Sequence, residues 1–250
     1  MGTLTQIWRY PIKSHGREAL DQISLTAGQT MPGDRLWAVA HELSQIDSES
    51  WAACQNFNRG SKAPALMALE SRLDWEQGRV TLSHPDLPDL DFAPDEPADQ
   101  ARFLEWVRPL IPENRAASAR VLRSKERGWT DTDLPSVTLC SVASHKAVEQ
   151  AMGHSLSPKR WRGNIWFEGV PEWAEFDWIG REIQVGDAVV IPRERTERCL
   201  ATTTNPDTGK RDADTLAALR TNWGHQDFSV RAEVVKSGTI RIGDALRILT

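Results

Sequence analysis

The alternation of hydrophobic and polar positions predicts short β-strands in the first third of the chain. Strand-like runs cover residues 4–12, 19–28, 34–42 and 79–85, and Gly or Pro residues lie between them. Short strands separated by turn residues are typical of a barrel or a curled sheet. The segment 83–97 is rich in Pro and Asp, so we expect an irregular acidic loop or linker there.

The rest of the chain combines helical and strand patterns. A helix is predicted within residues 98–111, and a short one over residues 216–224. The apolar run VTLCSV leads into another helix, for which Ser141 or Ser144 is the expected N-cap and Gly153 the expected end. Further strand-like runs cover residues 164–170, 182–191, 229–235 and 239–249. We therefore expect a mainly β fold with a few helices.

One local pattern occurs twice in the second half. Residues 182–191 and 239–248 share the pattern I-x-[VI]-G-D-A. Gly supplies the positive φ that a tight turn requires, so both segments are predicted to be strand–turn–strand units of similar construction.

Composition and charge exclude several classes of protein. Hydrophobic residues make up 40% of the 250 residues and charged residues 26%, as is usual for a globular protein. No apolar run approaches the roughly 18 residues that a membrane-spanning helix needs, and the first residues lack the pattern of a secretory signal. The net charge of −5 argues against a general nucleic-acid binder. We expect neither a membrane nor a nucleic acid as partner.

The three cysteines indicate a reducing compartment. An odd number of widely spaced cysteines is not a disulfide framework, so a cytoplasmic location is predicted. The sequence has neither a CxxC nor an HExxH motif, and three cysteines are too few for an iron–sulfur cluster held by four. Cys54 and Cys140 are interpreted as buried packing residues.

Cys199 lies in the segment whose residues are best suited to a chemical role. It follows Arg198 directly and precedes a polar, Thr-rich loop that contains Thr202 and reaches Asp212. Guanidinium groups beside a cysteine favour the thiolate, the form that attacks electrophiles and binds metals. The residues alone leave a nucleophile, a metal ligand and a plain packing role open.

Several basic segments could form an anion-binding site. Lys13 and Ser14 follow a predicted strand, Arg35 begins another, and Arg160 and Arg162 precede a third. Taken singly, each of these basic side chains is interpreted as an ordinary surface charge. Together they could clamp a phosphate or a carboxylate, through bidentate Arg and point-charge Lys contacts.

These segments, taken in order, resemble those of the MOSC-domain family, which is related to the C-terminal part of molybdenum cofactor sulfurases and to the mitochondrial amidoxime-reducing component. The matching strings are WRYPIKSHGREAL, GDRLWAV, DLPSVTLCSVAS, RWRGNIWFEG, ERCLATTTNPDTGKRD and SGTIRIGDAL. The resemblance covers nearly the whole chain. It implies a smaller, β-rich N-terminal domain over residues 1–95 and a MOSC β-barrel domain over residues 96–250, with a shared cleft between them.

The resemblance also implies a cofactor and the residues that bind it. Cys199 corresponds to the cysteine that holds molybdenum in a pterin cofactor (molybdopterin), or that carries sulfur. The remaining residues implied for the cofactor are Lys13, Ser14, Arg35, Thr132, Arg162, Asn164, Arg198 and Thr202. A catalytic Asp is expected just before residue 136, where Asp131 and Asp133 both stand, and Asp131 is our choice.

The sequence departs from the family pattern at two positions. Trp161 replaces a Phe, which keeps the aromatic character, and Asn205 replaces an Asp, which removes a charge from a turn. The membrane anchor and the ferredoxin-like extension of some relatives are also missing from the pattern. A reductase of this kind would therefore receive its electrons from a separate donor protein.

Three functions are compatible with the resemblance. The first is a molybdenum-dependent oxidoreductase that reduces small N-hydroxylated or N-oxide substrates at a centre ligated by Cys199. The second is a carrier of the cofactor or of sulfur, with a persulfide on Cys199 and no turnover. The third is a binding module whose pocket is a vestige.

Overall fold

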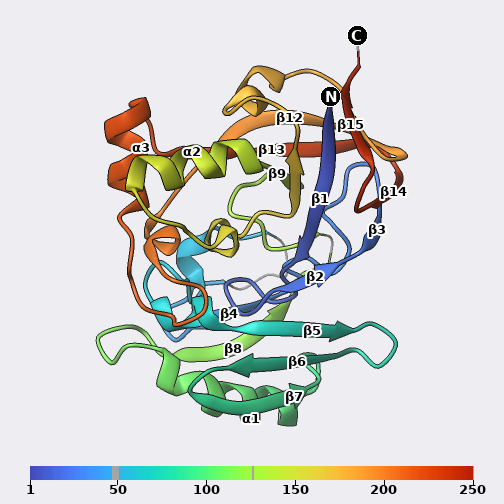
Figure 1. Cartoon of the computed structure of the whole chain (residues 1–250). Coiled ribbons are helices and arrows are strands. Elements are labelled where there is room, and N and C mark those ends of the chain that lie inside the picture. The colour runs from blue at the N-terminus through green and yellow to red at the C-terminus, as the bar shows by residue number, and fades with distance from the viewer. Residues whose placement is uncertain (47–50, 126, 250) are drawn as a thin grey trace.

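The computed structural model describes residues 1–46, 51–125 and 127–249, and it is mainly β. A barrel forms the upper part of the molecule, and smaller sheets with one helix form the lower part (Figure 1). The α-helices are α1 (Pro97–Val107), α2 (Val142–Met152) and α3 (Thr215–Trp223). The expected fold class is confirmed.

The barrel closes because β1 pairs with a strand on each side. It joins β10 and β15, both antiparallel, and so links the two ends of the sheet. The barrel strands are β1 (Gly2–Arg9), β9 (Val137–Ser141), β10 (Ile165–Glu168), β11 (Ile183–Val185), β12 (Ala188–Glu197), β13 (Asp227–Lys236) and β15 (Ala245–Ile248). The first strand of the chain thus completes a barrel whose other strands come from the second half.

The barrel interior is a single apolar core. Leu4 and Ile7 of β1 are fully buried with Ile165 of β10 and Val230 of β13. Alternating side chains of a strand point to opposite faces of the sheet, so each strand supplies its apolar face to this core. Burial of one such side chain contributes roughly 1.5–3 kcal/mol.

The lower part contains several smaller sheets. Its strands are β4 (Trp37–His41) paired with β8 (Ser118–Arg123), and β5 (Glu70–Asp74), β6 (Arg79–His84) and β7 (Leu87–Phe92) in one antiparallel sheet. Two further strands connect it to the barrel region: β2 (Glu18–Leu20) pairs with β1, and β3 (Gln22–Leu25) pairs with β14 (Gly238–Arg241).

The prediction of an irregular loop over residues 83–97 is wrong for its central part, which forms strand β7. Leu90 and Phe92 are buried there, and the ring of Phe92 stacks on Phe103 of α1 with centroids 4.8 Å apart. Pairing with β6 and packing on the helix that follows therefore override the local Pro and Asp content. The domain boundary after residue 95 stays a prediction. Two elements that follow it contact the part before it: α1 packs on β7, and β8 pairs with β4.

Helix α2 begins and ends as the sequence predicts. The Oγ atom of Ser141 accepts a hydrogen bond from the backbone N–H of Ser144 at 3.2 Å, so Ser141 is the N-cap. Gly153 ends the helix in a left-handed conformation with φ 72°. Helices α2 and α3 pack against each other beside the barrel (Figure 1).

The repeated I-x-[VI]-G-D-A segments differ in their pairing. The first forms the β11–β12 hairpin, with Gly186 at φ 55°. The second does not form a hairpin, because β14 pairs with β3 whereas β15 pairs with β11 and β1. A Cβ atom at Gly186 would lie 2.3 Å from the carboxylate of Asp244, so the two turns pack against each other.

Short 3-10 helices connect many of the strands. They are η1 (Cys54–Asn56), η2 (Pro64–Ala68), η3 (Arg108–Leu110), η4 (Pro158–Trp161), η5 (Ala174–Trp178) and η6 (Leu200–Thr203). Among the residues that the structure describes, no helix has the length and apolar character needed to cross a membrane.

Candidate functional site

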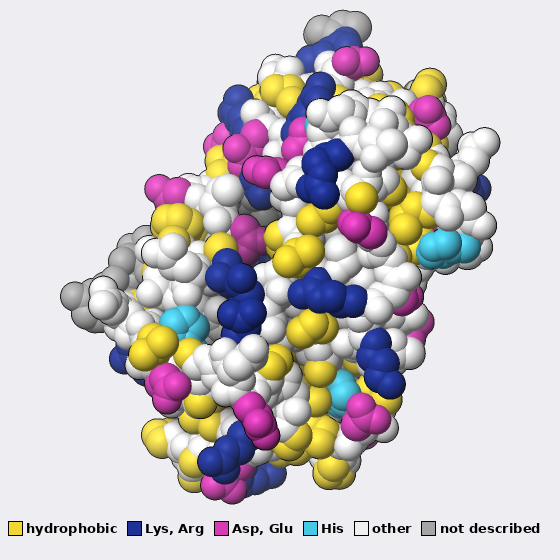
Figure 2. All heavy atoms as spheres, turned by 90° about the vertical axis from the view of Figure 1, so that its left-hand side faces the viewer, with side chains coloured by type: hydrophobic (Ala, Val, Ile, Leu, Met, Phe, Trp, Pro, Cys, Tyr) yellow, Lys and Arg dark blue, Asp and Glu magenta, His cyan; other side chains and the backbone are white. Residues whose placement is uncertain are grey.

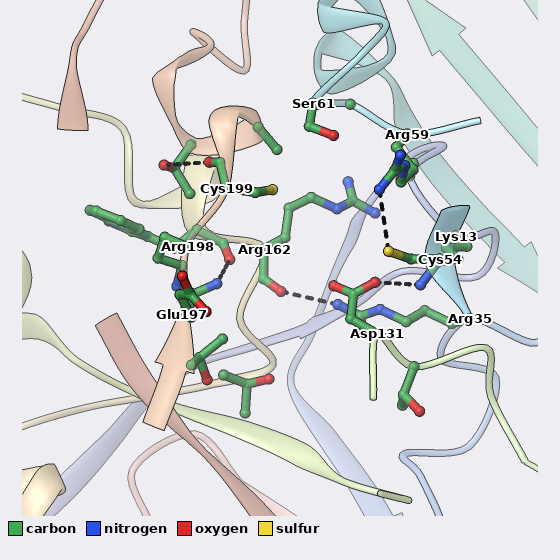
Figure 3. Close-up of a pocket in the computed structure, with 18 of the residues that line it drawn as sticks. Lys13, Arg35, Cys54, Arg59, Ser61, Asp131, Arg162, Glu197, Arg198 and Cys199 are labelled. Carbon is green, nitrogen blue, oxygen red and sulfur yellow. Dashed lines mark hydrogen bonds and ion pairs between the residues drawn. The ribbon is translucent and has the colours of Figure 1, made fainter. Parts of the chain in front are cut away.

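A cavity of about 250 Å³ brings residues of both halves of the chain together (Figure 3). The predicted site residues that line it are Lys13, Ser14, Arg35, Asp131, Arg162, Asn164, Arg198, Cys199 and Thr202. Thr132 is not among the lining residues; its carbonyl accepts a hydrogen bond from Thr130, which lines the cavity instead. The cavity thus joins loops that lie far apart in the sequence.

Cys199 presents an exposed thiol in a well-anchored backbone. It follows the end of β12 and precedes η6. Its carbonyl oxygen accepts hydrogen bonds from the backbone N–H and the Oγ1 hydroxyl of Thr202, both at 3.1 Å. The same hydroxyl contacts Oγ1 of Thr215 at 2.7 Å, which connects the loop to α3. The backbone is thereby held in place while the sulfur remains available.

Arg198 and Asn164 use their polar atoms within the protein. The guanidinium of Arg198 donates to the carbonyl oxygens of Trp161 and Phe228 at 2.6–2.9 Å. Its burial lowers its pKa to about 10. The amide of Asn164 accepts from the N–H of Thr138 and donates to the carbonyl of Trp8, both at 3.2 Å. These contacts favour a positioning role over direct contact with a ligand.

Lys13 and Asp131 form an ion pair at one end of the cavity. Lys13 is only 3% exposed, and its ammonium group donates to the carboxylate of Asp131 and to the carbonyl of Trp129. The Lys13 charge holds the pKa of Asp131 well below its usual range. The alternative carboxylate, Asp133, pairs with Arg127 and is not in the lining.

Two arginines lie against the same tyrosine ring beside this pair. Tyr10 is buried, and its ring centroid lies 4.9 Å from Cζ of Arg35 and 4.3 Å from Cζ of Arg162. Its hydroxyl donates to the carbonyl of Gly163 at 3.1 Å, and burial raises the pKa of that hydroxyl. Cation–π attraction to the ring offsets part of the repulsion between the guanidinium groups.

Backbone strain is concentrated at the cavity. Ser14, Arg35 and Arg162 adopt left-handed conformations with φ of 64°, 53° and 50°. Such conformations cost of order 1 kcal/mol or more in residues with side chains, and they persist where the surrounding structure enforces them. Another such residue, Ser229, accepts a hydrogen bond from Arg198.

The cavity is strongly cationic in a protein of net charge −5. Its charged lining residues are Lys13, Arg35, Arg59, Arg160, Arg162, Arg198 and Arg231, against Asp131 and Glu197. Lys and Arg side chains also lie across the middle of the face shown in Figure 2. Within the described ranges, Arg59, Arg162 and Arg198 have no carboxylate at ion-pair distance. In the part of the chain that the structure describes, the Nη2 atom of Arg162 is buried without a hydrogen-bond partner.

Sequence reasoning missed one wall of the cavity. Cys54, Arg59, Gly60 and Ser61 line it, although Cys54 was expected to be a buried packing residue. Cys54 is half-buried, and its Sγ atom accepts a hydrogen bond from Nη1 of Arg59 at 3.3 Å. The signal in the sequence was the basic, Gly-containing stretch 59–62. Cys140 is fully buried, as expected.

Family comparisons agree with this arrangement of two parts around one cavity. Residues 1–119 match the model of the MOSC N-terminal beta barrel domain, and residues 132–247 match the model of the MOSC domain. The chain is a MOSC-domain protein. Within the described residues of this MOSC-domain protein, no three His, Cys, Asp or Glu side chains are grouped to hold a metal ion.

Curated relatives and a solved structure resemble the whole chain. Mitochondrial amidoxime-reducing component 1 of Mus musculus is 26% identical over 297 aligned positions, which cover all of this chain and 83% of that protein. The Homo sapiens protein of the same name is 24% identical with the same coverage. The crystal structure of the YuaD protein from Bacillus subtilis has a TM-score of 0.49 and 12% identity, covering 98% of this chain and 94% of that one.

Proposed function

We propose that this MOSC-domain protein binds a molybdenum cofactor of the molybdopterin type, with Cys199 as the protein ligand of the metal. The observation that carries the proposal is one exposed thiol in a cavity with three guanidinium groups that have no carboxylate partner among the described residues. A thiolate is a soft ligand suited to a thiolate-rich metal centre, and the cations suit a phosphorylated pterin. The relatives named above are amidoxime-reducing components, which supports the same assignment.

The polar groups of the cavity fit such a cofactor. Lys13, Ser14 and Arg35 would contact its phosphate and pterin, and the unpartnered Nη2 of Arg162 would donate to it. A buried guanidinium without a counter-charge is costly, so an anionic ligand stabilises this cavity. Arg198, Asn164 and Thr202 would hold the walls in place through their contacts with the backbone.

We infer that the loaded protein reduces small N-hydroxylated or N-oxide substrates. A molybdenum centre supplies two-electron redox chemistry in which oxygen leaves the substrate. Asp131 is kept ionised by Lys13, so its carboxylate accepts a hydrogen bond from a substrate N–H or O–H group and orients it. This gives the predicted catalytic Asp131 the role of an acceptor.

The partners of the proposed reaction follow from the cysteine content. Three free cysteines cannot supply a four-cysteine iron–sulfur cluster, so the electrons are proposed to come from a separate donor protein. The free thiols are consistent with the reducing cytoplasm as the proposed location.

Molybdenum content per chain tests the proposal. The protein is produced in a host that makes the cofactor, purified without oxygen, and analysed for molybdenum as wild type, Cys199→Ala and Cys54→Ser. We expect close to one molybdenum per chain in the wild type and in Cys54→Ser, and almost none in Cys199→Ala. Cys54→Ser is the matched control, because it removes a second cavity sulfur but keeps an acceptor for Arg59.

Two outcomes would contradict the enzyme proposal. Metal absent from all three proteins, while a known molybdenum protein loads in the same host, would exclude the loaded cofactor. A mass increase of one sulfur atom on Cys199 in that metal-free protein would identify a persulfide carrier instead.

A further inference from the structure

The cavity wall formed by Cys54, Arg59, Gly60 and Ser61 contains a cation that the family resemblance leaves without a role. Arg59 lines the cavity, is half-buried and has Cys54 Sγ as its one polar side-chain contact among the described residues. A thiol is a weak, uncharged acceptor, so it orients the guanidinium but does not neutralise it. In Figure 3 the side chains of Arg59 and Arg162 both extend toward the middle of the pocket.

The segment that carries Arg59 is fixed beside the Cys199 loop. Arg211 donates to the carbonyl oxygen of Ser61 at 2.8 Å and to that of Leu200 at 2.7 Å, and so ties the two loops together. A Cβ atom at Gly60 would lie 2.6 Å from Sδ of Met67, so a larger residue here would require the Met67 side chain to move. The position of Arg59 is therefore built into the fold.

The distribution of counter-charges distinguishes two groups of cations in the cavity. Lys13 is already paired with Asp131, and Arg35 with Asp34. Arg59 and Arg162 have no carboxylate at ion-pair distance within the part of the chain that the structure describes. The unneutralised charge of this group therefore lies on Arg59 and Arg162, and not on Lys13 or Arg35.

We propose that Arg59 and Arg162 form an oxyanion subsite that binds a phosphate or carboxylate group of a ligand. Guanidinium groups bind such groups through paired N–H donors, and a half-buried cavity strengthens the contact. The anion is either the phosphate of the cofactor or a carboxylate on the substrate. This inference rests on the proposed function and deepens it, but anion binding itself is tested on cofactor-free protein.

The test uses cofactor-free protein and two simple probes. Inorganic phosphate and benzoate are titrated separately by calorimetry, at constant ionic strength, into wild type, Arg59→Gln, Arg59→Lys and Lys62→Gln. We expect Arg59→Gln to weaken binding of at least one probe about tenfold, the usual effect of losing a charge-assisted contact. Lys62→Gln is the matched control, because Lys62 is exposed, close in sequence and outside the lining.

The two titrations, combined with the molybdenum content, show whether the bound anion belongs to the cofactor or to the substrate. Loss of phosphate binding together with a lower molybdenum content in Arg59→Gln would assign the subsite to the cofactor. Loss of benzoate binding with unchanged molybdenum content would assign it to a substrate carboxylate. Arg59→Lys keeps the charge, so it shows intermediate binding even where Arg59→Gln folds poorly.

Two results would overturn the inference. One is a wild type that binds neither probe, and the other is Arg59→Gln that binds both as the wild type does. The molybdenum proposal would survive either result, since its own test is the metal content of the wild type and of Cys199→Ala.

Discussion

Buried ionisable side chains differ in how many of their polar atoms have a hydrogen-bond or ion-pair partner. Arg198 has carbonyl acceptors on several sides, and Lys13 has a carboxylate. Within the part of the chain that the structure describes, the Ser144 hydroxyl donates to Oε2 of Glu175 at 3.0 Å, while Oε1 is buried without a hydrogen-bond partner. Burial raises the pKa of Glu175 to about 7.

Glu175 makes stability depend on pH in a defined window. The unfolded chain ionises this carboxyl near pH 4.5, whereas the folded protein keeps the proton until about pH 7. The native state binds more protons in that window, so stability falls as the pH rises through it. Glu175→Gln removes this titration, and we expect its stability relative to wild type to increase by about 3 kcal/mol across the window.

Urea unfolding at a series of pH values measures this effect. Glu172→Gln, an exposed substitution of the same type three residues away, is expected to follow the wild-type curve. A Glu175→Gln curve parallel to that of the wild type would show that Glu175 titrates normally.

At the level of elements, the approach to β10 passes very close to β9. A Cβ atom at Gly163 would lie 2.1 Å from Sγ of Cys140, and Gly163 stands between Arg162 and Asn164. Gly163 does not have a positive φ, so glycine is needed there because a Cβ atom has no room. The contact links the packing of a strand to the position of Arg162.

Gly163→Ala is therefore expected to destabilise the protein by about 2 kcal/mol, the usual cost of overpacking. Adding Cys140→Ala removes the clashing sulfur, and we expect part of that stability to return, so the two changes are not additive. Thermal unfolding of the two single variants and the double variant measures the coupling. Strict additivity would contradict the predicted contact.

Local pattern predicted many elements because their signals lie within a few residues. The Ser141 N-cap, the Gly153 end of α2 and strand β1 are examples. Strand β7 escaped prediction because its pairing with β6 and its apolar contact with α1 outweigh its own Pro and Asp residues, which favour a loop. The strand–turn–strand unit around Gly243 was predicted, but not that β14 pairs with β3 while β15 pairs with β11 and β1.

At the scale of the whole molecule, buried Arg17 holds the two parts together. Its guanidinium donates to the carbonyl of Met67 at 2.6 Å, to Glu70 at 2.6 Å and to the carbonyl of Pro206 at 2.9 Å. Pro206 belongs to the loop that follows Cys199, so one side chain connects that loop to the lower sheets.

Arg17→Met leaves these acceptors without their donor and is expected to lower the free energy of unfolding by about 3–5 kcal/mol. We also expect the molybdenum content to fall, because the loop after Cys199 loses an anchor. Arg72→Met, an exposed change on β5, is the control for the loss of a positive charge. Unchanged urea unfolding of Arg17→Met would rule out this anchoring role.

The sequence by itself determined the mainly β class, the family and the order of the motifs that supply Lys13, Arg162 and Cys199, because these depend on local pattern. Only the tertiary structure decided that β1 closes the barrel and that Arg59 faces the same cavity as Cys199. Such neighbours are more than a hundred residues apart, and packing brings them together. The same packing decides which polar groups form hydrogen bonds within the protein and which remain available to a ligand.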